Sequence, residues 1–141
     1  MTIEAPSPLR EPVLDVEVQG DLATRRRTAV AEAVADAATR CGRPTRPAAA
    51  GLRRYGPGCL VLALAGRFDR PAVERLRALG PEIERRATSE LVVDLSHLER
   101  CDALLARAVA RIRIRCLANE ARVELHDPPP ALAAELGQLR L

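Results

Sequence analysis

The chain has 141 residues, which is enough for one domain with a buried core and too few for a second domain of ordinary size. All 22 basic residues are arginine, and 19 acidic residues are interspersed with them, so the formal charge of +3 is a mild bias. One Tyr, one Phe and no Trp leave almost no side chains on which bases could stack. We therefore expect no nucleic-acid partner of the single-stranded type.

No apolar run approaches the roughly 20 residues that cross a bilayer, so no membrane insertion is expected. The N-terminal sequence MTIEAPSPLREPV has acids and prolines where a secretory signal peptide has an apolar stretch, which predicts a cytoplasmic protein. The cysteines form no CxxC pair, and in a reducing compartment we expect small buried side chains without a metal or cofactor. They are Cys41, Cys59, Cys101 and Cys116.

Residues 1–50 are interpreted as an N-terminal extension. Prolines and polar residues predict a loose tail at 1–12, and the alternation in VLDVEVQG predicts a strand at 13–20. A helix is predicted from about residue 22 to residue 41, with an apolar stripe of Val30, Val34, Ala37 and Cys41. The Pro and Gly content of GRPTRPAAAG, residues 42–51, predicts a linker.

A β-hairpin and a helix are predicted next. LRRY (52–55), the turn GPG and the apolar run CLVLALAG (59–66) form the hairpin, whose second strand is expected to be buried on both faces. Asp69 is the predicted cap of the helix that follows, because Pro71 lies in its first turn and apolar residues recur at helical spacing. Gly80-Pro81 is expected to kink or divide this helix.

The rest of the chain alternates strands and helices. ELVVDL (90–95) and ARVELHD (121–127) are predicted strands, and PPPALAAELGQLRL ends the chain with a short helix. Between the strands, a helix from Asp102 to about Ala118 has the core face Leu105, Val109, Ile112 and Cys116. From residue 52 the order is therefore β-β-α-β-α-β-α, which predicts an α/β fold with a mixed sheet and right-handed crossovers.

Three segments together resemble the STAS domain, the fold of anti-sigma factor antagonists. LVLALAGRFD is similar to the family's strand and Gly-x-Leu-Asp, ELVVDLSHLERCD to its strand and Asp-Leu-Ser loop, and ARVELHDPPPALAAELGQLRL to its last strand, turn and helix. The resemblance covers a STAS-like domain at about 51–141 and leaves the first fifty residues unexplained. It implies a mixed sheet with the helices packed mainly on one face, preceded here by the strand-helix extension.

The family's phosphorylation signature, Asp-Ser-Ser/Thr-Gly-Leu, aligns with Asp102, Ala103, Leu104, Leu105 and Ala106. The acceptor serine falls on Ala103, so no phosphorylation is expected there. In the antagonists that this chain resembles, a free hydroxyl at the helix start permits docking on an anti-sigma kinase and a phosphate blocks it. The resemblance thus implies a switch fixed in its uncharged state.

Two leucines follow Ala103 at a helix start, where backbone N–H groups usually favour an anion. Helical spacing places Leu105 on the core stripe and rotates Leu104 by about 100°, so Leu104 is expected to be partly exposed. An exposed leucine is consistent with a remodelled protein interface. Chance loss of the motif in a decayed family member is the alternative.

The resemblance implies a non-enzymatic regulatory domain whose partner is a protein, such as an anti-sigma factor or kinase-like regulator. A homodimer is compatible with this interpretation. The implied contact residues are Gly66, Asp69, Asp102, Ala103, Leu104, Arg107 and Arg111. The alternative from a different class is a STAS-like structural or scaffold subunit of a larger assembly or of a transporter complex.

Two chemical hypotheses remain. His97 and Cys101 flank the loop before Asp102, with Asp94 nearby, so a thiol enzyme is a remote alternative. Against it, the family position of Cys101 is an apolar residue under the sheet, and His97 is expected in an exposed loop. A metal site would need distant ligands with no paired close spacing, namely His97, Cys101, Cys116 and His126.

Arginines recur every four residues along the helix that begins after Asp102, at Arg107, Arg111 and Arg115. At this spacing they lie on one stripe of the helix. The stripe is interpreted either as a patch for an anion or acidic partner or as an ordinary solvated face.

Overall fold

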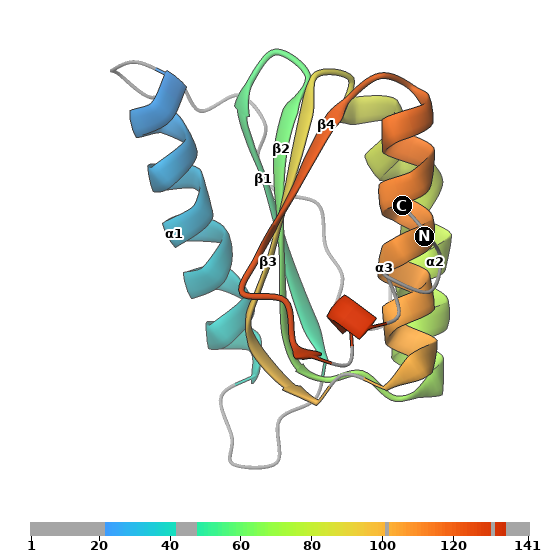
Figure 1. Cartoon of the computed structure of the whole chain (residues 1–141). Coiled ribbons are helices and arrows are strands. Elements are labelled where there is room, and N and C mark those ends of the chain that lie inside the picture. The colour runs from blue at the N-terminus through green and yellow to red at the C-terminus, as the bar shows by residue number, and fades with distance from the viewer. Residues whose placement is uncertain (1–21, 42–47, 101, 131, 135–141) are drawn as a thin grey trace, which may run out of the picture.

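Four strands form one mixed sheet in the order β1-β2-β3-β4 (Figure 1) in the computed structural model, which describes residues 22–41, 48–100, 102–130 and 132–134. The first two strands are antiparallel, and the second, third and fourth are parallel neighbours. Their bounds are β1 (Ala49–Gly56), β2 (Cys59–Arg67), β3 (Glu90–Arg100) and β4 (Arg122–His126). The predicted α/β class is confirmed.

Helices cover both faces of this sheet (Figure 1). α2 (Arg70–Arg86) and α3 (Ala103–Ala118) pack on one face, as the resemblance implies, and α1 (Leu22–Cys41) packs on the other. The last predicted helix is present at residues 130 and 132–134, where Leu132 is buried in the α2/α3 side of the core. No helix in the described part of the chain is long and apolar enough to cross a membrane. The strand predicted at 13–20 and the predicted tail at 1–12 lie outside the described residues.

β2 is buried on both faces, as its continuous apolar run predicts. Leu60, Leu62 and Leu64 belong to the core cluster that includes α2 and α3. Val61 and Ala63 belong to a separate cluster with α1. Because each face of β2 is apolar, the strand needs a covering layer on each side.

The predicted apolar stripe of α1 is confirmed at Ala37 but displaced by one residue at its first two positions. Ala29, Ala33 and Ala37 are the buried positions, whereas Val30 and Val34 are only partly buried. The side chain of Cys41, the last member of the predicted stripe, lies outside the part of the structure that is described.

Close approach of α1 to β1 explains this displacement. Gly51 of β1 lies against the backbone of Ala33, and a Cβ at Gly51 would overlap the Ala33 carbonyl oxygen. Small side chains on both elements permit this distance, whereas valines in the same place would hold the helix further from the sheet.

Several predicted boundaries are wrong. Residues 49–51, predicted as the end of a linker, belong to β1, whose pairing with β2 begins at Ala49. β3 was expected to end at residue 95, but one extra residue between Asp94 and His97 forms a bulge, beyond which pairing with β2 continues to Arg100. His97 consequently lies in a strand and not in a loop. The helix predicted to kink or divide at Gly80-Pro81 is not divided: α2 continues through Pro81, with Gly80 and Ile83 buried on either side of it.

We expect Gly51→Ala to destabilise the protein by about 1–3 kcal/mol, because the added methyl group must displace the backbone of α1. Urea unfolding followed by circular dichroism measures this change. Gly80→Ala is the matched control, since a Cβ there meets only Ile112 Cγ1, at 3.7 Å, in a helix interior. The control is expected to be neutral or to stabilise by about 0.5–1 kcal/mol. Equal stability of both variants would contradict the close approach.

Candidate functional site

The start of α3 combines a capping carboxylate with exposed apolar carbon. Asp102 Oδ1 accepts a hydrogen bond of 3.0 Å from the Leu105 backbone N–H and caps the helix. Leu105 is fully buried, as predicted, whereas Leu104 is 41 % exposed. Ala103 is exposed and offers no hydroxyl.

The loop before α2 lies at the same end of the sheet. Gly66, next to the last residue of β2, has a φ of 83°, a left-handed conformation that favours glycine. Asp69 caps α2, because its Oδ1 accepts a 3.0 Å hydrogen bond from the Ala72 N–H. Both helices follow the carboxyl ends of parallel strands that are paired to each other. In open α/β sheets, such ends are where binding residues converge. The structure thus places five predicted residues at one end, here called the helix-start surface: Gly66, Asp69, Asp102, Ala103 and Leu104.

A groove runs from the helix-start surface between α2 and α3. It consists of two hollows that share Glu74, Arg77, Ala108 and Arg111 in their walls, so they form one continuous depression, here called the α2/α3 groove. Leu104 lies at one end of this groove. The two remaining predicted contact residues, Arg107 and Arg111, both line it.

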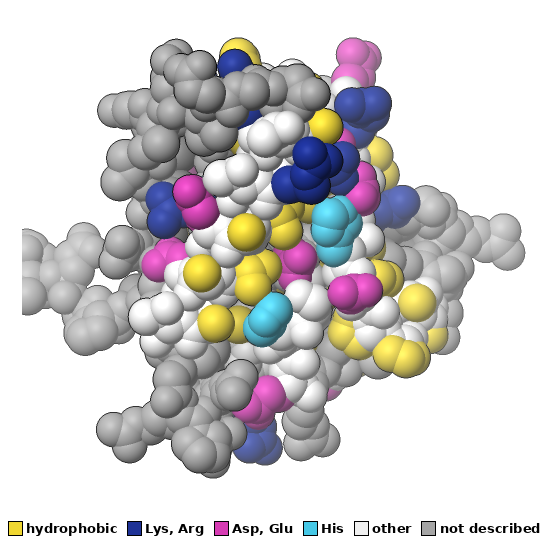
Figure 2. Space-filling view, turned by 90° about the vertical axis from the view of Figure 1, so that its left-hand side faces the viewer, with side chains coloured by type: hydrophobic (Ala, Val, Ile, Leu, Met, Phe, Trp, Pro, Cys, Tyr) yellow, Lys and Arg dark blue, Asp and Glu magenta, His cyan; other side chains and the backbone are white. Residues whose placement is uncertain are grey.

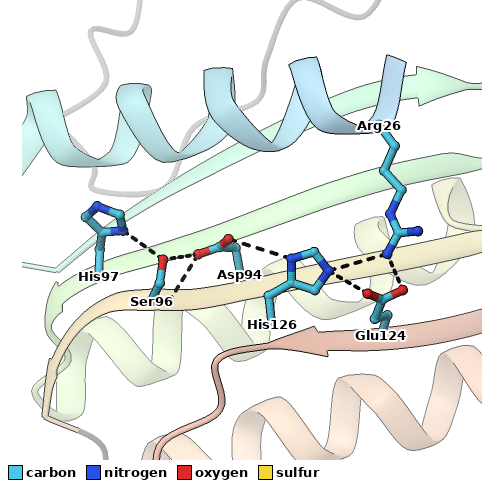
Figure 3. Close-up of polar contacts among 6 residues, drawn as sticks. All are labelled: Arg26, Asp94, Ser96, His97, Glu124 and His126. Carbon is cyan, nitrogen blue, oxygen red and sulfur yellow. Dashed lines mark hydrogen bonds and ion pairs between the residues drawn. The ribbon is translucent and has the colours of Figure 1, made fainter. Parts of the chain in front are cut away.

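A polar cluster occupies the opposite face of the sheet, on the side of α1 (Figure 3). Asp94 is only 6 % exposed, and its Oδ1 accepts hydrogen bonds from the Ser96 N–H, at 3.1 Å, and from the Ser96 hydroxyl, at 2.6 Å. His97 Nδ1 lies 2.9 Å from the same hydroxyl oxygen. The bulge in β3 directs Ser96 and His97 toward the same face as Asp94.

β4 and α1 complete this cluster. His126 is paired with Asp94 in the sheet, and its Nδ1 lies 3.9 Å from Asp94 Oδ2. Its Nε2 lies 2.6 Å from a Glu124 carboxylate oxygen, and Arg26 of α1 pairs with Glu124 and lies 3.3 Å from the same Nε2. Partial burial raises the pKa of Glu124, but the hydrogen bonds from His126 and Arg26 outweigh it and hold this pKa below its usual value. Arg26 therefore links α1 to the edge strand.

Both histidines of the chain are visible on this face of the molecule, with acidic side chains near them (Figure 2). The arrangement does not form a nucleophile, base and orienting acid in series. The Ser96 hydroxyl donates directly to Asp94, so its lone pairs, and not its proton, face His97.

The thiol-enzyme hypothesis gains no support from this geometry. His97 is linked to Asp94 only through Ser96, and Cys101 lies outside the described residues. Cys59 and Cys116 are buried, and burial, followed by nearby glutamate charge, raises the pKa of both thiols, that of Cys116 to about 11. Within the described residues, no group of three or more His, Cys, Asp or Glu side chains is arranged to hold a metal ion.

Sequence reasoning missed the polar cluster as a unit. Its members were individually visible, since Asp94 interrupts an apolar strand and the alternation of residues 121–127 places Glu124 and His126 on one face. The register that pairs Asp94 with His126, and the contact of Arg26 with Glu124 across 98 positions, depend on the assembled sheet.

Comparisons with known proteins agree with the fold. The family model described as “Mlab, STAS domain” matches residues 52–141. The Bacillus cell fate determinant SpoIIAA in its phosphorylated form has 22 % identity and a TM-score of 0.56, with 64 % of this chain and 83 % of that chain covered. The anti-sigma factor antagonist SpoIIAA in its unphosphorylated form has 24 % identity and a TM-score of 0.53, with 61 % and 79 % covered. No curated protein matches the chain.

Truncating the two neighbouring leucines should lower the stability of the protein by very different amounts. Leu105→Ala leaves a cavity in the core and is expected to cost about 2–5 kcal/mol. Leu104→Ala removes a side chain that is 41 % exposed and should cost less than about 1 kcal/mol. Thermal unfolding of both variants measures the difference, and equal destabilisation would mean that Leu104 is core filling.

The buried thiols should react slowly with thiol reagents in the folded protein. Their raised pKa should also lower the stability of the fold at alkaline pH. Between the usual thiol pKa of 9.0 and the folded-state value of about 11, the unfolded chain loses the Cys116 proton while the folded chain keeps it, so the free energy of unfolding falls as pH rises. Unfolding at pH 8, 9.5 and 10.5 is compared with that of Cys116→Ala, whose alkaline loss should be smaller. In the same buffers, rapid labelling of Cys59 or Cys116 in the folded protein would contradict their burial.

Proposed function

Because the chain belongs to the STAS-domain family, we propose that it is a non-enzymatic regulatory domain that binds a protein partner and lacks the family's phosphoacceptor serine. The observation that carries this proposal is the start of α3. There, Leu104 exposes 41 % of its surface beside an exposed Ala103. An apolar side chain held on a capped helix is a suitable anchor for a partner, because it loses little conformational freedom on binding.

The absence of a hydroxyl changes how such binding is controlled. A phosphate at the position of Ala103 would add about two negative charges at the helix start, and Ala103 cannot carry one. Ser96, in the strand that precedes α3, is on the α1 side of the sheet, where its hydroxyl donates to Asp94. Partner binding at the helix-start surface is thus proposed to be independent of phosphorylation at this position.

The partner class follows from the likeness to SpoIIAA, whose unphosphorylated form is described as an anti-sigma factor antagonist. We propose an anti-sigma factor or a related kinase-like regulator as the partner. The capped helix starts at the ends of β2 and β3 provide a preorganised surface for it, since Asp69 and Asp102 both fix the local backbone.

A scaffold subunit of a larger assembly is the second candidate function. Leu22 on α1 and Leu117 near the end of α3 are 48 % and 39 % exposed, although neither belongs to the helix-start surface. Single exposed leucines are ordinary on a protein surface, but a scaffold would bury several of them against permanent neighbours. Such a complex would survive purification and would not depend on Leu104 alone.

The test uses the full chain as bait in extracts of its native cells, with wild type, Leu104→Ser and Leu117→Ser compared by quantitative mass spectrometry. Leu117→Ser is the matched control, because both leucines are exposed on α3 and differ in their distance from the helix start. We expect Leu104→Ser to lose a specific partner and Leu117→Ser to retain it. The loss should exceed about 1 kcal/mol when the purified partner is titrated.

Circular dichroism checks that all three baits are folded. Identical partner sets for the wild type and Leu104→Ser would remove the helix-start surface from the proposal. Loss of the same stable complex in both leucine variants would favour the scaffold instead.

A further inference from the structure

The α2/α3 groove is basic in its walls. Five arginines and two glutamates line it, so the groove alone has a formal charge of +3. The charged residues are Arg70, Glu74, Arg77, Glu84, Arg107, Arg111 and Arg115. The Glu84 carboxylate accepts a 2.8 Å hydrogen bond from Arg115 Nε, and the Glu74 carboxylate lies 3.5 Å from the Arg77 guanidinium. Each carboxylate of the groove therefore already has a cation beside it.

Apolar carbon lies between these charges. Val73, Ala108 and Ile112 contribute to the walls, and Leu104 and Ile114 are 41 % and 38 % exposed there. A small polar anion would leave this apolar surface in water. An occupant with its own apolar face would remove the surface from water and also meet the arginines.

The dimensions of the groove suit a helix. On α3 it extends from Leu104 to Arg115, which is about 17 Å along the helix axis at the usual rise per residue. This length corresponds to about three helical turns of an occupant lying between α2 and α3. A helix in a groove is recognised by apolar side chains spaced three and four residues apart along one stripe.

We propose that the α2/α3 groove binds an acidic amphipathic helix of a protein partner. Its apolar stripe would pack on Ala108 and Ile114, and its flanking carboxylates would meet the guanidinium groups of Arg70 and Arg111, whose planar geometry suits carboxylates. The inference rests on the proposed function, because it names the chemistry of the partner that docks at the adjoining helix-start surface. Charge complementarity selects this occupant over a basic or purely apolar one.

A segment of the same chain is the competing occupant. The N-terminal sequence contains Glu11, Asp15 and Glu17 among valines and a leucine, so it has a similar acidic and apolar composition. The experiment must therefore separate binding of a partner from binding of this segment.

The probe is a fluorescein-labelled synthetic helix of about 14 residues, with leucines on one stripe and glutamates beside them. Its lysine-for-glutamate counterpart and a scrambled sequence are the control peptides. Fluorescence anisotropy with the full chain should show binding of the glutamate peptide at least about tenfold tighter than that of either control. The affinity should fall as NaCl is raised, because the proposed contacts are solvent-accessible ion pairs.

Matched variants locate the binding. Arg111→Glu should weaken binding of the glutamate peptide by at least about tenfold, whereas Arg75→Glu, also on an exposed helix position but outside the groove, should change it by less than about twofold. Ile114→Ser should weaken binding, and Leu117→Ser, at a position of similar exposure outside the groove, should not. Thermal unfolding confirms that each variant is folded.

Several results would overturn the proposal: no binding of the glutamate peptide to the wild type, equal binding of the lysine peptide, or equal weakening by Arg111→Glu and Arg75→Glu. A full-length variant with Glu11→Gln, Asp15→Asn and Glu17→Gln tests the competing occupant. If it binds the peptide about tenfold more tightly than the wild type, the groove is occupied by the chain's own segment, and the partner proposal fails. Intact peptide binding together with Leu104-independent partner capture would contradict the proposed function alone.

Discussion

The burial of β2 and β3 on both faces is the constraint on which the rest of the molecule depends. Leu62 and Val93 point toward α2 and α3, whereas Val61 and Val92 point toward α1. Apolar side chains on both faces require two covering layers, since either face left in water would expose a large apolar surface. The matched family region begins at residue 52, so it contains the α2/α3 layer, and α1 supplies the second layer from outside it. Although α1 precedes the matched region, it thus packs as part of the same core.

The second covering layer is the single helix α1, and the polar cluster lies on the strands that this helix covers least. α1 packs mainly on β1 and β2 through alanines at close distance, which brings one side of the helix near the remaining strands. On β3 and β4 the same face of the sheet carries Asp94, Glu124 and His126 in place of aliphatic residues. Buried Asp94 has hydrogen-bond partners, as buried polar groups require, whereas exposed Glu124 is held by His126 and Arg26, which extends the network from the helix to the edge strand. On β3 and β4, hydrogen bonds and ion pairs thereby link the sheet to α1 where apolar packing does not.

Sequence periodicity predicted those features that are decided locally. The apolar run of β2, the capping roles of Asp69 and Asp102, and the opposite environments of Leu104 and Leu105 follow from spacing and side-chain chemistry, and the structure confirms them. The stripe of α1 was predicted correctly at Ala37 but misplaced at its first two positions, because Gly51 on another element determines which side of the helix can approach the sheet. The α2/α3 groove was inaccessible to sequence reasoning for a similar reason, since helical spacing aligns Arg107 with Arg111 but does not say that Arg70 lies across from them.

The proposed lack of a phosphoacceptor at Ala103 would be physically related to the basic character of the groove. Ala103 and Arg107 are four residues apart on α3 and hence neighbours on the helix surface, at the place where the helix-start surface meets the groove. A phosphate at position 103 would compete for the arginines that an acidic partner is proposed to contact, and it would repel the partner's carboxylates. Alanine leaves those arginines to the partner, and exposed Leu104 adds apolar surface next to them. In this chain, the proposed partner would supply the negative charge that a phosphorylated relative would carry itself, so replacing serine with alanine would favour acidic occupants of the groove.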